Sequence, residues 1–347
     1  MNRWAVAIFA TALSTIYEVD MKAGKLKESI LKRSVLKQLH KRNETTIIAP
    51  MVGGDFGAVS VNEEYAVTVS SEPITLTQDA IGSAAIYAAC NDVACSGAKP
   101  VGVSVVVLVP TSTNEEEIRN IIKDIDAACE VCGVDVLSGH TEVTRVVKEP
   151  LVTVTAIGAG KKDQLIHSSK MLAGMDIVAT KWIGLEGTAI LAKEKEEVLC
   201  TRYAKPFIDR AKTFDQMMSV LPEAAVAVQS GAGAMHDVSE GGVFGALWEM
   251  AESASVGLEI DLKKIPIRQE TVEICECLDV NPYKLLSGGC LLIATEDGNG
   301  LVMELEKANI PAVIIGKAIE GNDRVLINDD ERRFLETAQT DELYIFQ

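Results

Sequence analysis

Residues 79–109, DAIGSAAIYAACNDVACSGAKPVGVSVVVLV, set the architecture of this sequence. The first part, residues 79–94, is mostly apolar and rich in alanine, which predicts a helix that is largely buried. Gly97 and Pro100 are residues that commonly end helices. Residues 101–109 are almost all β-branched or Leu, as in a buried strand. A buried helix that leads directly into a buried strand predicts a mixed α/β protein.

The alternation of helix and strand continues on both sides of this stretch. Residues 22–40 have apolar side chains near helical spacing, and Thr113-x-x-Glu116 matches a capping box for a helix that runs to Cys132. The pattern becomes polar near residues 160–169. We therefore expect an α/β (α+β) fold with two domains, residues 21–165 and residues 166–347. Further strands are expected at 46–48, 65–69, 134–137, 151–157, 176–181, 257–260, 291–295 and 312–315, and further helices at 188–197, 222–230, 242–253, 270–277 and 298–308.

Composition limits the classes of function. The 347 residues carry 33 basic and 50 acidic side chains, a formal charge of −17, which argues against a nucleic-acid or anionic-membrane surface. The eight cysteines lie mostly in apolar segments, which favours reduced thiols in a cytoplasmic protein. Cys129-x-x-Cys132 has a spacing seen in metal sites, but no second pair follows it. We therefore interpret both as core thiols.

The first twenty residues are interpreted separately as an N-terminal extension. Residues 4–17 form an apolar run shorter than the roughly 20 residues that cross a bilayer. The run is similar to the core of a signal peptide, which is the alternative interpretation. Against export stand the free-cysteine pattern and the lack of a clear cleavage site, and Met21 begins a basic amphipathic segment.

Two motifs combine carboxylates with turn or helix signals. In residues 52–59, VGGDFGAV, three glycines surround Asp55, which suits a backbone turn close to phosphate with a carboxylate for magnesium. An ordinary turn between strands would use the same residues. Asn91 and Asp92 lie late in an apolar helix, where a buried carboxylate needs a partner. A cation is one such partner; a helix-end cap or exposure to solvent is the alternative.

Two further motifs place polar residues beside predicted elements. Gly139, His140 and Thr141 follow the strand expected at 134–137, in what we interpret as a loop that could face a ligand. His140 could equally be a surface loop residue. Asp237 lies in residues 236–243, HDVSEGGV, just before a predicted helix, where it is another candidate acidic ligand.

Taken together, these motifs resemble those of the AIR-synthase-like family. The segments that carry the resemblance are GDFGAV (54–59), EPIT (72–75), NDVA (91–94), GAKP (97–100), GHTEV (139–143) and DVSEGG (237–242). They occur in the family's order and span residues 24–328. The EPIT and GHTEV segments look most like the HypE-type hydrogenase maturation factors.

The resemblance implies a two-domain fold in which the N-terminal sheets of two subunits pair, with ATP at their interface and a C-terminal α/β sandwich domain. It implies ATP and Mg²⁺ as cofactors, a small-molecule substrate and a homodimer. By position it implies a metal site at Asp55, Asp92 and Glu72, catalytic roles for Asp92 and Asp237, and cofactor binding by Gly53, Gly54, Asp55, Asn91, Gly139, His140 and Thr141. Carboxylates and glycine backbone suit phosphoryl transfer, which needs mainly positioning and charge neutralisation.

The sequence also departs from the family pattern. Glu72 stands where relatives often have Asp, and His140 stands where many have Asp. The HypE-type tail ends in a cysteine that receives a carbamoyl group, whereas this chain has no cysteine after Cys290. We therefore expect an ATP-dependent enzyme that does not use the tail-cysteine route to a cyano ligand. The alternative is a nucleotide-binding regulatory or partner-binding protein on the same scaffold, with slow turnover or none.

Overall fold

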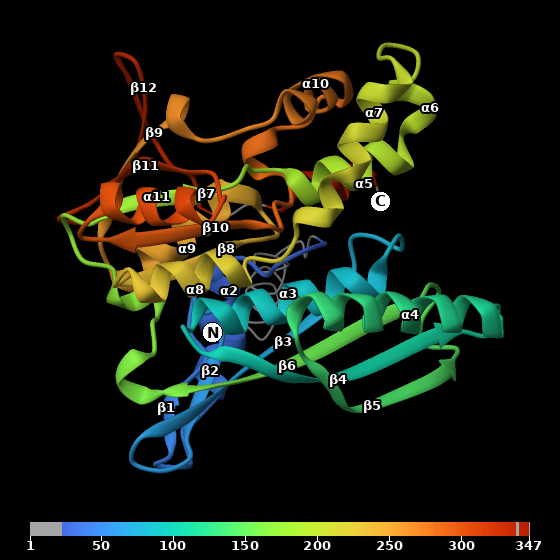
Figure 1. Cartoon of the computed structure of the whole chain (residues 1–347), viewed down its shortest axis with the longest axis horizontal. Coiled ribbons are helices and arrows are strands. Elements are labelled where there is room, and N and C mark those ends of the chain that lie inside the picture. The colour runs from blue at the N-terminus through green and yellow to red at the C-terminus, as the bar shows by residue number, and fades with distance from the viewer. Residues whose placement is uncertain (1–22, 338–339, 347) are drawn as a thin grey trace, which may run out of the picture.

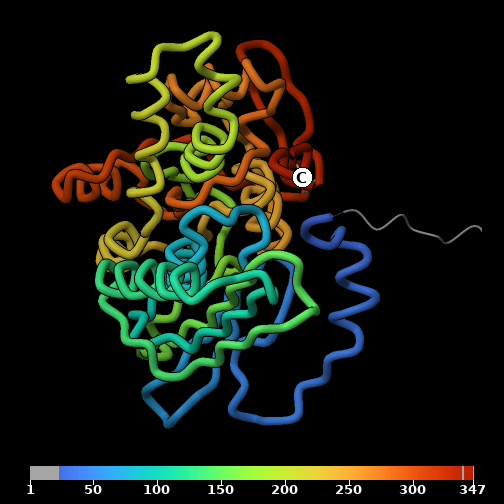
Figure 2. The backbone as a smooth tube through the Cα atoms, turned by 90° about the vertical axis from the view of Figure 1, so that its right-hand side faces the viewer, coloured from blue at the N-terminus to red at the C-terminus, as the bar shows by residue number. Residues whose placement is uncertain are grey.

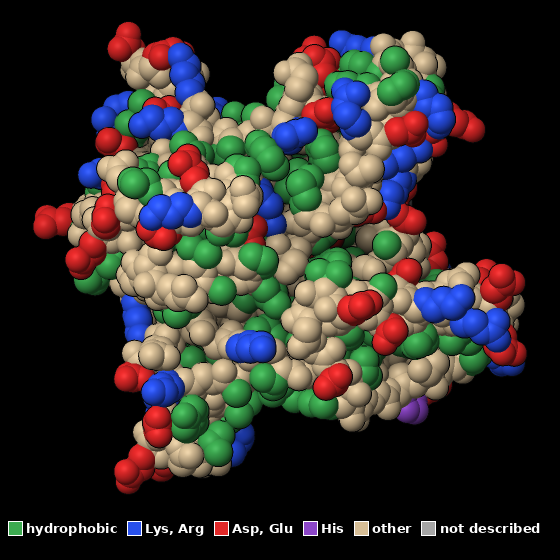
Figure 3. Space-filling view, viewed as in Figure 1, with side chains coloured by type: hydrophobic (Ala, Val, Ile, Leu, Met, Phe, Trp, Pro, Cys, Tyr) green, Lys and Arg blue, Asp and Glu red, His purple; other side chains and the backbone are tan. Residues whose placement is uncertain are grey.

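Two β-sheets of different topology organise the chain (Figure 1). The computed structural model describes residues 23–337 and 340–346, so the extension expected at residues 1–20 lies outside the described residues. None of the helices in this described part is long and apolar enough to cross a membrane. Lys, Arg, Asp and Glu are interspersed over the face shown in Figure 3.

The N-terminal half is built on a six-stranded sheet with the strand order β1-β2-β3-β6-β4-β5. Only the β4–β5 pair is parallel; the other pairs are antiparallel. Alternate residues of β3 and β6 are buried, which is the pattern of a sheet covered on one face. The strands are β1 (Thr46–Ile48), β2 (Gly57–Ser60), β3 (Tyr65–Ile74), β4 (Lys99–Pro110), β5 (Asp135–Thr144) and β6 (Leu151–Lys161).

Helices α3 (Ile81–Cys95) and α4 (Glu115–Cys132) cover one face of this sheet and lie between it and the C-terminal half (Figure 1). The side chains of Val69 on β3 and Val106 on β4 remain more than a third exposed, and Leu137 on β5 is 60% exposed. The face opposite the helices therefore keeps an apolar surface open to solvent.

The capping box of α4 differs from the predicted one by one residue. The Asn114 side chain accepts hydrogen bonds from the backbone N–H groups of Glu116 and Glu117, and the Glu117 carboxylate accepts one from the Asn114 backbone N–H. Thr113 was the wrong N-cap because Asn114, one residue later, has the extended backbone that an N-cap requires.

The C-terminal half contains a seven-stranded sheet with the order β13-β12-β9-β11-β7-β10-β8. Helix α9 packs on one face, against Ile177 and Ala179 of β7; α8 and α11 pack on the other, against Val178. This arrangement confirms the α/β sandwich. Its strands are β7 (Asp176–Thr180), β8 (Ala234–Val238), β9 (Gly257–Asp261), β10 (Cys290–Thr295), β11 (Ala312–Ile319), β12 (Arg324–Asn328) and β13 (Glu331–Phe334); its helices are α5 (Leu185–Glu194), α6 (Glu196–Leu199), α7 (Lys205–Lys212), α8 (Leu221–Gln229), α9 (Gly242–Ala254), α10 (Gln269–Leu278) and α11 (Gly298–Lys307).

The two halves share packing along α3. Ala94 and Cys95, at its carboxyl end, belong to the same buried cluster as the residues of α8 and α11. The helix predicted over residues 22–40 is shorter and irregular: α2 (Glu28–Ile30) continues as a π-helical turn (Leu31–Val35) and a 3-10 turn (Leu36–Gln38). In Figure 2 this N-terminal segment lies beside the body of the molecule, close to the C-terminal end.

Candidate active site

A cavity of about 680 Å³ lies between the two halves and is lined by acidic side chains from both. Asp55 precedes β2, Glu72 lies on β3 and Asp92 on α3, while Asp237 lies on β8 of the other half. The structure thus brings together four carboxylates that the sequence singled out, although residues 55 and 237 are 182 positions apart.

Asp92 is the most deeply placed of the N-terminal carboxylates, with 8% of its surface exposed. The Ser70 hydroxyl donates a hydrogen bond to Asp92 Oδ2 at 2.5 Å. Burial, and after it the nearby charges of Asp237 and Glu72, raise the pKa of Asp92 well above its ordinary value. A carboxylate in this position is poorly compensated without a cation.

Asp55 and Glu72 have the same electrostatic problem. Burial raises the pKa of Asp55 to about 7, although the charge of His236 opposes the change. Burial also raises the pKa of Glu72, and the charge of Lys25 counters that change. Because each carboxylate disfavours ionisation of the next, the group as a whole favours a bound positive charge.

His236 is the imidazole of this cavity and points its Nε2 at two carboxylates. Nε2 lies 3.3 Å from Asp55 Oδ1 and 3.5 Å from Glu249 Oε2, while Nδ1 lies 2.8 Å from the backbone oxygen of Asp237. Burial alone would lower the pKa of His236, but the charges of Asp55 and Glu249 raise it to about 9. Burial would raise the pKa of Glu249, but the charges of Lys25 and His236 outweigh it and lower that pKa to about 2.

The glycine turn before β2 lies against α9. Gly53 has a φ of +66°, and a Cβ atom added there would collide with the backbone oxygen of Glu249. Only glycine fits this combination of conformation and close approach. The Ser168 hydroxyl donates to the Gly53 oxygen at 2.5 Å and fixes the turn from the segment that joins the halves.

Asp55 and Asp237 also converge with a thiol. One oxygen of each carboxylate and Sγ of Cys95 lie within 4.8 Å of one another. Burial raises the pKa of Cys95 well above its ordinary value, so the sulfur remains a neutral thiol. A neutral thiol does not suit a hard cation, whereas the two carboxylates do.

Four of the predicted cofactor-binding residues do not line the cavity. The Asn91 amide donates to the Met218 oxygen and accepts from Val220 N, both at 2.9 Å, so this side chain joins α3 to the C-terminal half instead. Gly139, His140 and Thr141 are exposed on β5. The prediction of a loop there was wrong, because the strand continues through residue 144 along β4.

Sequence reasoning missed three residues at or beside the site. Lys25 and Glu249 line the cavity. His167 is 6% exposed, and its Nε2 has no hydrogen-bond partner among the described residues; it faces the position that a Gly54 side chain would occupy, 3.7 Å away. Lys25 and Glu249 lie in segments predicted as helices, at 22–40 and 242–253, and His167 lies in the polar stretch at 160–169, so none of them carried a sequence signal that pointed to a site.

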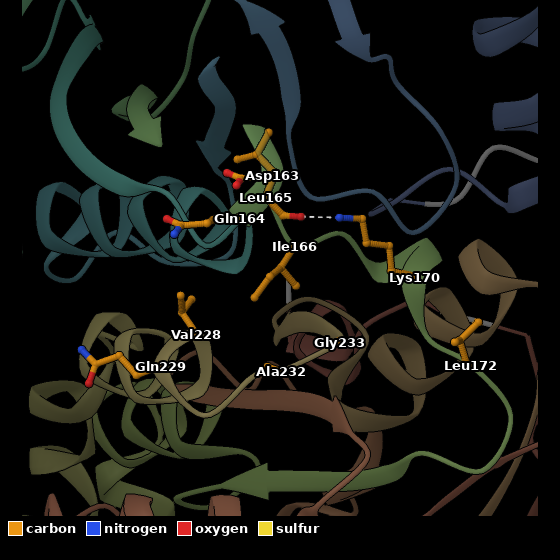
Figure 4. A pocket seen from close by; sticks show the side chains of 10 residues that line it. All are labelled: Asp163, Gln164, Leu165, Ile166, Lys170, Leu172, Val228, Gln229, Ala232 and Gly233. Atoms are coloured by element: carbon orange, nitrogen blue, oxygen red, sulfur yellow. Dashed lines mark hydrogen bonds between the residues drawn. The ribbon is translucent and has the colours of Figure 1, made fainter. Parts of the chain in front are cut away.

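A second cavity, of about 800 Å³, lies between residues 163–172 and residues 228–233 (Figure 4). Ile166, Leu172 and Val228 supply much of its lining, and the Lys170 ammonium is hydrogen-bonded to the Leu165 oxygen at 2.5 Å. Although it is larger than the carboxylate cavity, it gathers no comparable set of titratable groups. The acidic cavity is therefore the candidate active site.

Comparison with protein families identifies this scaffold. The N-terminal domain of AIR synthase related protein matches residues 51–159, and the C-terminal domain of the same family matches residues 173–328. The chain belongs to the AIR synthase related family. The six-stranded sheet and the sandwich of this family member therefore correspond to its two family domains.

The individual relatives below share 25–27% sequence identity with this chain. A hydrogenase expression/formation protein of Methanocaldococcus jannaschii is 27% identical over 320 residues, which cover 88% of this chain and 91% of the relative. The carbamoyl dehydratase HypE of Rhodobacter capsulatus is 25% identical over 74% of each chain. The thiamine-monophosphate kinase of Pyrococcus horikoshii is 26% identical over 81% of this chain and 87% of its own.

Solved structures show the same fold. HypE of E. coli superposes on this chain with a TM-score of 0.70 at 17% identity, and the superposition covers 99% of each chain. A hydrogenase maturation protein HypE solved in complex with ATP gives a TM-score of 0.69 at 16% identity, covering 93% of this chain and 97% of its own.

Proposed function

We propose that the chain is an ATP- and Mg²⁺-dependent enzyme that activates a small amide-, carbonyl- or phosphate-bearing substrate. The reaction would be phosphoryl transfer or an ATP-driven dehydration. The observation that carries the proposal is the convergence of Asp55, Glu72, Asp92 and Asp237 on one cavity between the two halves. The similarity to a kinase, to a dehydratase and to a HypE solved with ATP supports it.

The residues present fit magnesium. Asp55, Asp92 and Glu72 offer hard oxygen ligands whose pKa values burial raises, so a divalent cation would relieve their mutual repulsion. When bound, Mg²⁺ would neutralise charge on the phosphates of ATP. Asp237 approaches from the opposite half and is our candidate for a second catalytic carboxylate beside Asp92.

The glycine turn is the proposed phosphate-binding element. Gly53 and Gly54 place backbone, without side chains, next to Asp55 in the wall of the cavity. Glycine at such a turn permits close approach of backbone N–H groups to an anion. Phosphoryl transfer depends mainly on such positioning and on charge neutralisation, which is why a site without an obvious nucleophile suits it.

We also propose a homodimer formed through the six-stranded sheet. Its face opposite α3 and α4 exposes Val69, Val101 and Val106, and β5 is exposed along its length. Such an apolar face on a sheet is typical of an interface. In that assembly Gly139, His140 and Thr141 could reach the nucleotide of the partner subunit, which they do not reach within one chain.

The second candidate function is a nucleotide-binding regulatory or partner-binding protein. It is favoured by Glu72 and His140, which replace shorter or harder ligands expected from the family resemblance.

The two candidates differ in turnover. ADP release from MgATP should rise at least tenfold over background with one member of a panel of carbamoyl, formyl and phosphate compounds. Tight MgATP binding with no substrate-dependent release of ADP or AMP would favour the regulatory protein instead.

A further inference from the structure

The N-terminal segment is attached to α9 by polar contacts at the mouth of the carboxylate cavity. The Trp248 indole donates to Glu28 Oε2 at 3.0 Å, and Lys32 Nζ lies 2.5 Å from Glu28 and 2.7 Å from Glu252. Residues 25–31 consequently form part of the cavity lining. A segment more than 200 positions from α9 in sequence is thereby placed over the site.

Lys25 is the residue of this segment that contacts the acidic wall. Its backbone N–H donates to Glu240 Oε1 at 2.8 Å, and its Nζ lies 3.4 Å from Glu249 Oε2. It lines the same cavity as Asp55 and Asp92. The backbone is therefore anchored, whereas the ammonium group is 3.4 Å from a single carboxylate and the side chain remains 44% exposed.

The cavity lining carries more acidic than basic side chains, and this excess of negative charge favours a cation there. Among the described residues of the lining, the positive side chains are Lys25, Lys27 and His236. His236 is 3% exposed and held by the backbone of Asp237, and Lys27 forms no ion pair within the described chain. Lys25 is thus the cation that can both approach the carboxylates and turn away from them. An ammonium on a four-carbon stem is suited to such a change.

Resting on the nucleotide-binding function proposed above, we propose that Lys25 is the resident counter-ion of the carboxylate cavity. Without metal, its ammonium group offsets the charge of the carboxylates around it. With Mg²⁺ and ATP, the carboxylates hold the metal and the Lys25 ammonium binds phosphate oxygen. No bond is made or broken in this exchange; one cation replaces another, and the lysine gains an anionic partner in the ligand.

A counter-ion role predicts that one substitution at Lys25 changes the affinity for a divalent metal and the affinity for MgATP in opposite directions. Lys25→Met keeps the length and apolar stem but removes the charge. Affinity for Mn²⁺ alone should rise roughly fivefold to tenfold, because a competing positive charge is gone. Affinity for MgATP should fall roughly tenfold, because a charged hydrogen bond to the ligand is lost. Isothermal titration of the full chain measures both quantities.

Two variants serve as controls. Lys25→Arg keeps the charge and should stay within about threefold of the natural chain for both ligands. Lys37→Met removes a charge from the same N-terminal segment at an exposed position outside the cavity lining, and should change neither affinity by more than about twofold.

Lys25→Met binding both Mn²⁺ and MgATP more weakly, with a lower Tm, would overturn the inference and make Lys25 only an attachment of the segment to α9. Unchanged affinities would overturn it as well. Failure of the natural chain to bind MgATP would instead contradict the proposed function, and the Mn²⁺ titration would still decide the counter-ion role in the metal-free cavity.

Discussion

Nε2 of His236 lies 3.3 Å from Oδ1 of Asp55, which joins β8 of the C-terminal sheet to the glycine turn that precedes β2. The contact is between a proposed metal ligand of one half and a buried imidazole of the other. Occupation of the cavity by a cation would therefore change the electrostatics of the interface between the halves. The proposed metal site therefore lies at the interface between the two halves.

Asp92→Asn tests the metal role most simply. The substitution keeps the shape of the side chain and removes a buried charge, so the chain should fold with a Tm equal to or above that of the natural protein. MgATP affinity should fall at least tenfold, and any turnover much further, because charge neutralisation is lost. Calorimetry and a coupled ADP assay measure these effects. The matched control is Asp126→Asn on the exposed face of α4.

Asp55→Asn should have a similar effect, and the double variant should be little worse than either single one. The reason is that both carboxylates act on one ion, so removing the second costs little once the site is lost. Strictly additive losses in binding free energy would show that the two residues act at separate sites.

His167→Leu should stabilise the empty protein while weakening nucleotide binding. Ser169 N–H donates to Nδ1 at 3.2 Å, so the proton of the neutral ring lies on the unpartnered Nε2 beside Gly54. Removing an unsatisfied buried donor relieves a desolvation cost of about 1–3 kcal/mol. Thermal unfolding should show a higher Tm and titration a lower MgATP affinity; His167→Gln, which keeps a donor, should bind better than His167→Leu. A lower Tm with normal binding would give His167 a purely structural role.

Glu186→Gln should flatten the pH dependence of stability. Burial, and after it the charge of Asp341, raise the pKa of Glu186 to about 7. A carboxyl whose pKa is raised on folding stabilises the fold most below its unfolded value of about 4.5, and this contribution is lost as pH rises through 7. The natural chain should lose up to about 3 kcal/mol of unfolding free energy between pH 4.5 and 8 through this group. Denaturant unfolding of both chains at several pH values checks it; equal slopes would show that Glu186 is not the group responsible.

Val106→Glu should disrupt the proposed homodimer. Val106 lies on β4 and is 36% exposed on the sheet face opposite α3 and α4, and a buried, unpaired charge at an interface costs several kcal/mol. Light scattering should give about twice 37.2 kDa for the natural chain and close to 37.2 kDa for the variant. Met303→Glu, at a more open position on α11, should leave the mass unchanged. A natural chain that is monomeric at micromolar concentration would contradict the interface.

Sequence patterns predicted the elements whose signals are local. The apolar helix with a polar pair at its end became α3 with Asp92 inside the cavity, and the β-branched run became β4. Strand β8 was missed because its five residues, AMHDV, include two polar side chains, yet all five are buried. Burial of His236 and Asp237 is imposed by the opposite half of the molecule and leaves no periodic signal.

Other misses have the same physical cause. Lys25 acts on Glu240 and Glu249, 215 and 224 positions away, so its role could not be predicted from its neighbours in sequence. The family resemblance implied cofactor binding by Asn91, a polar residue in an apolar helix that needs a partner. The partner is the backbone at residues 218 and 220 instead.

The metal-dependent nucleotide site is tested most directly by titrating the natural chain with ATP in the presence of Mg²⁺ and, separately, in the presence of EDTA. With Mg²⁺ we expect saturable binding and, at ATP concentrations about 100 times Kd, a stabilisation of about 2.7 kcal/mol, seen as a rise in Tm of roughly 3–5 °C. With EDTA, and for Asp92→Asn under both conditions, the shift should be small. An identical shift in all of these samples would contradict a metal-dependent nucleotide site at Asp55 and Asp92, as would no shift for the natural chain at millimolar MgATP.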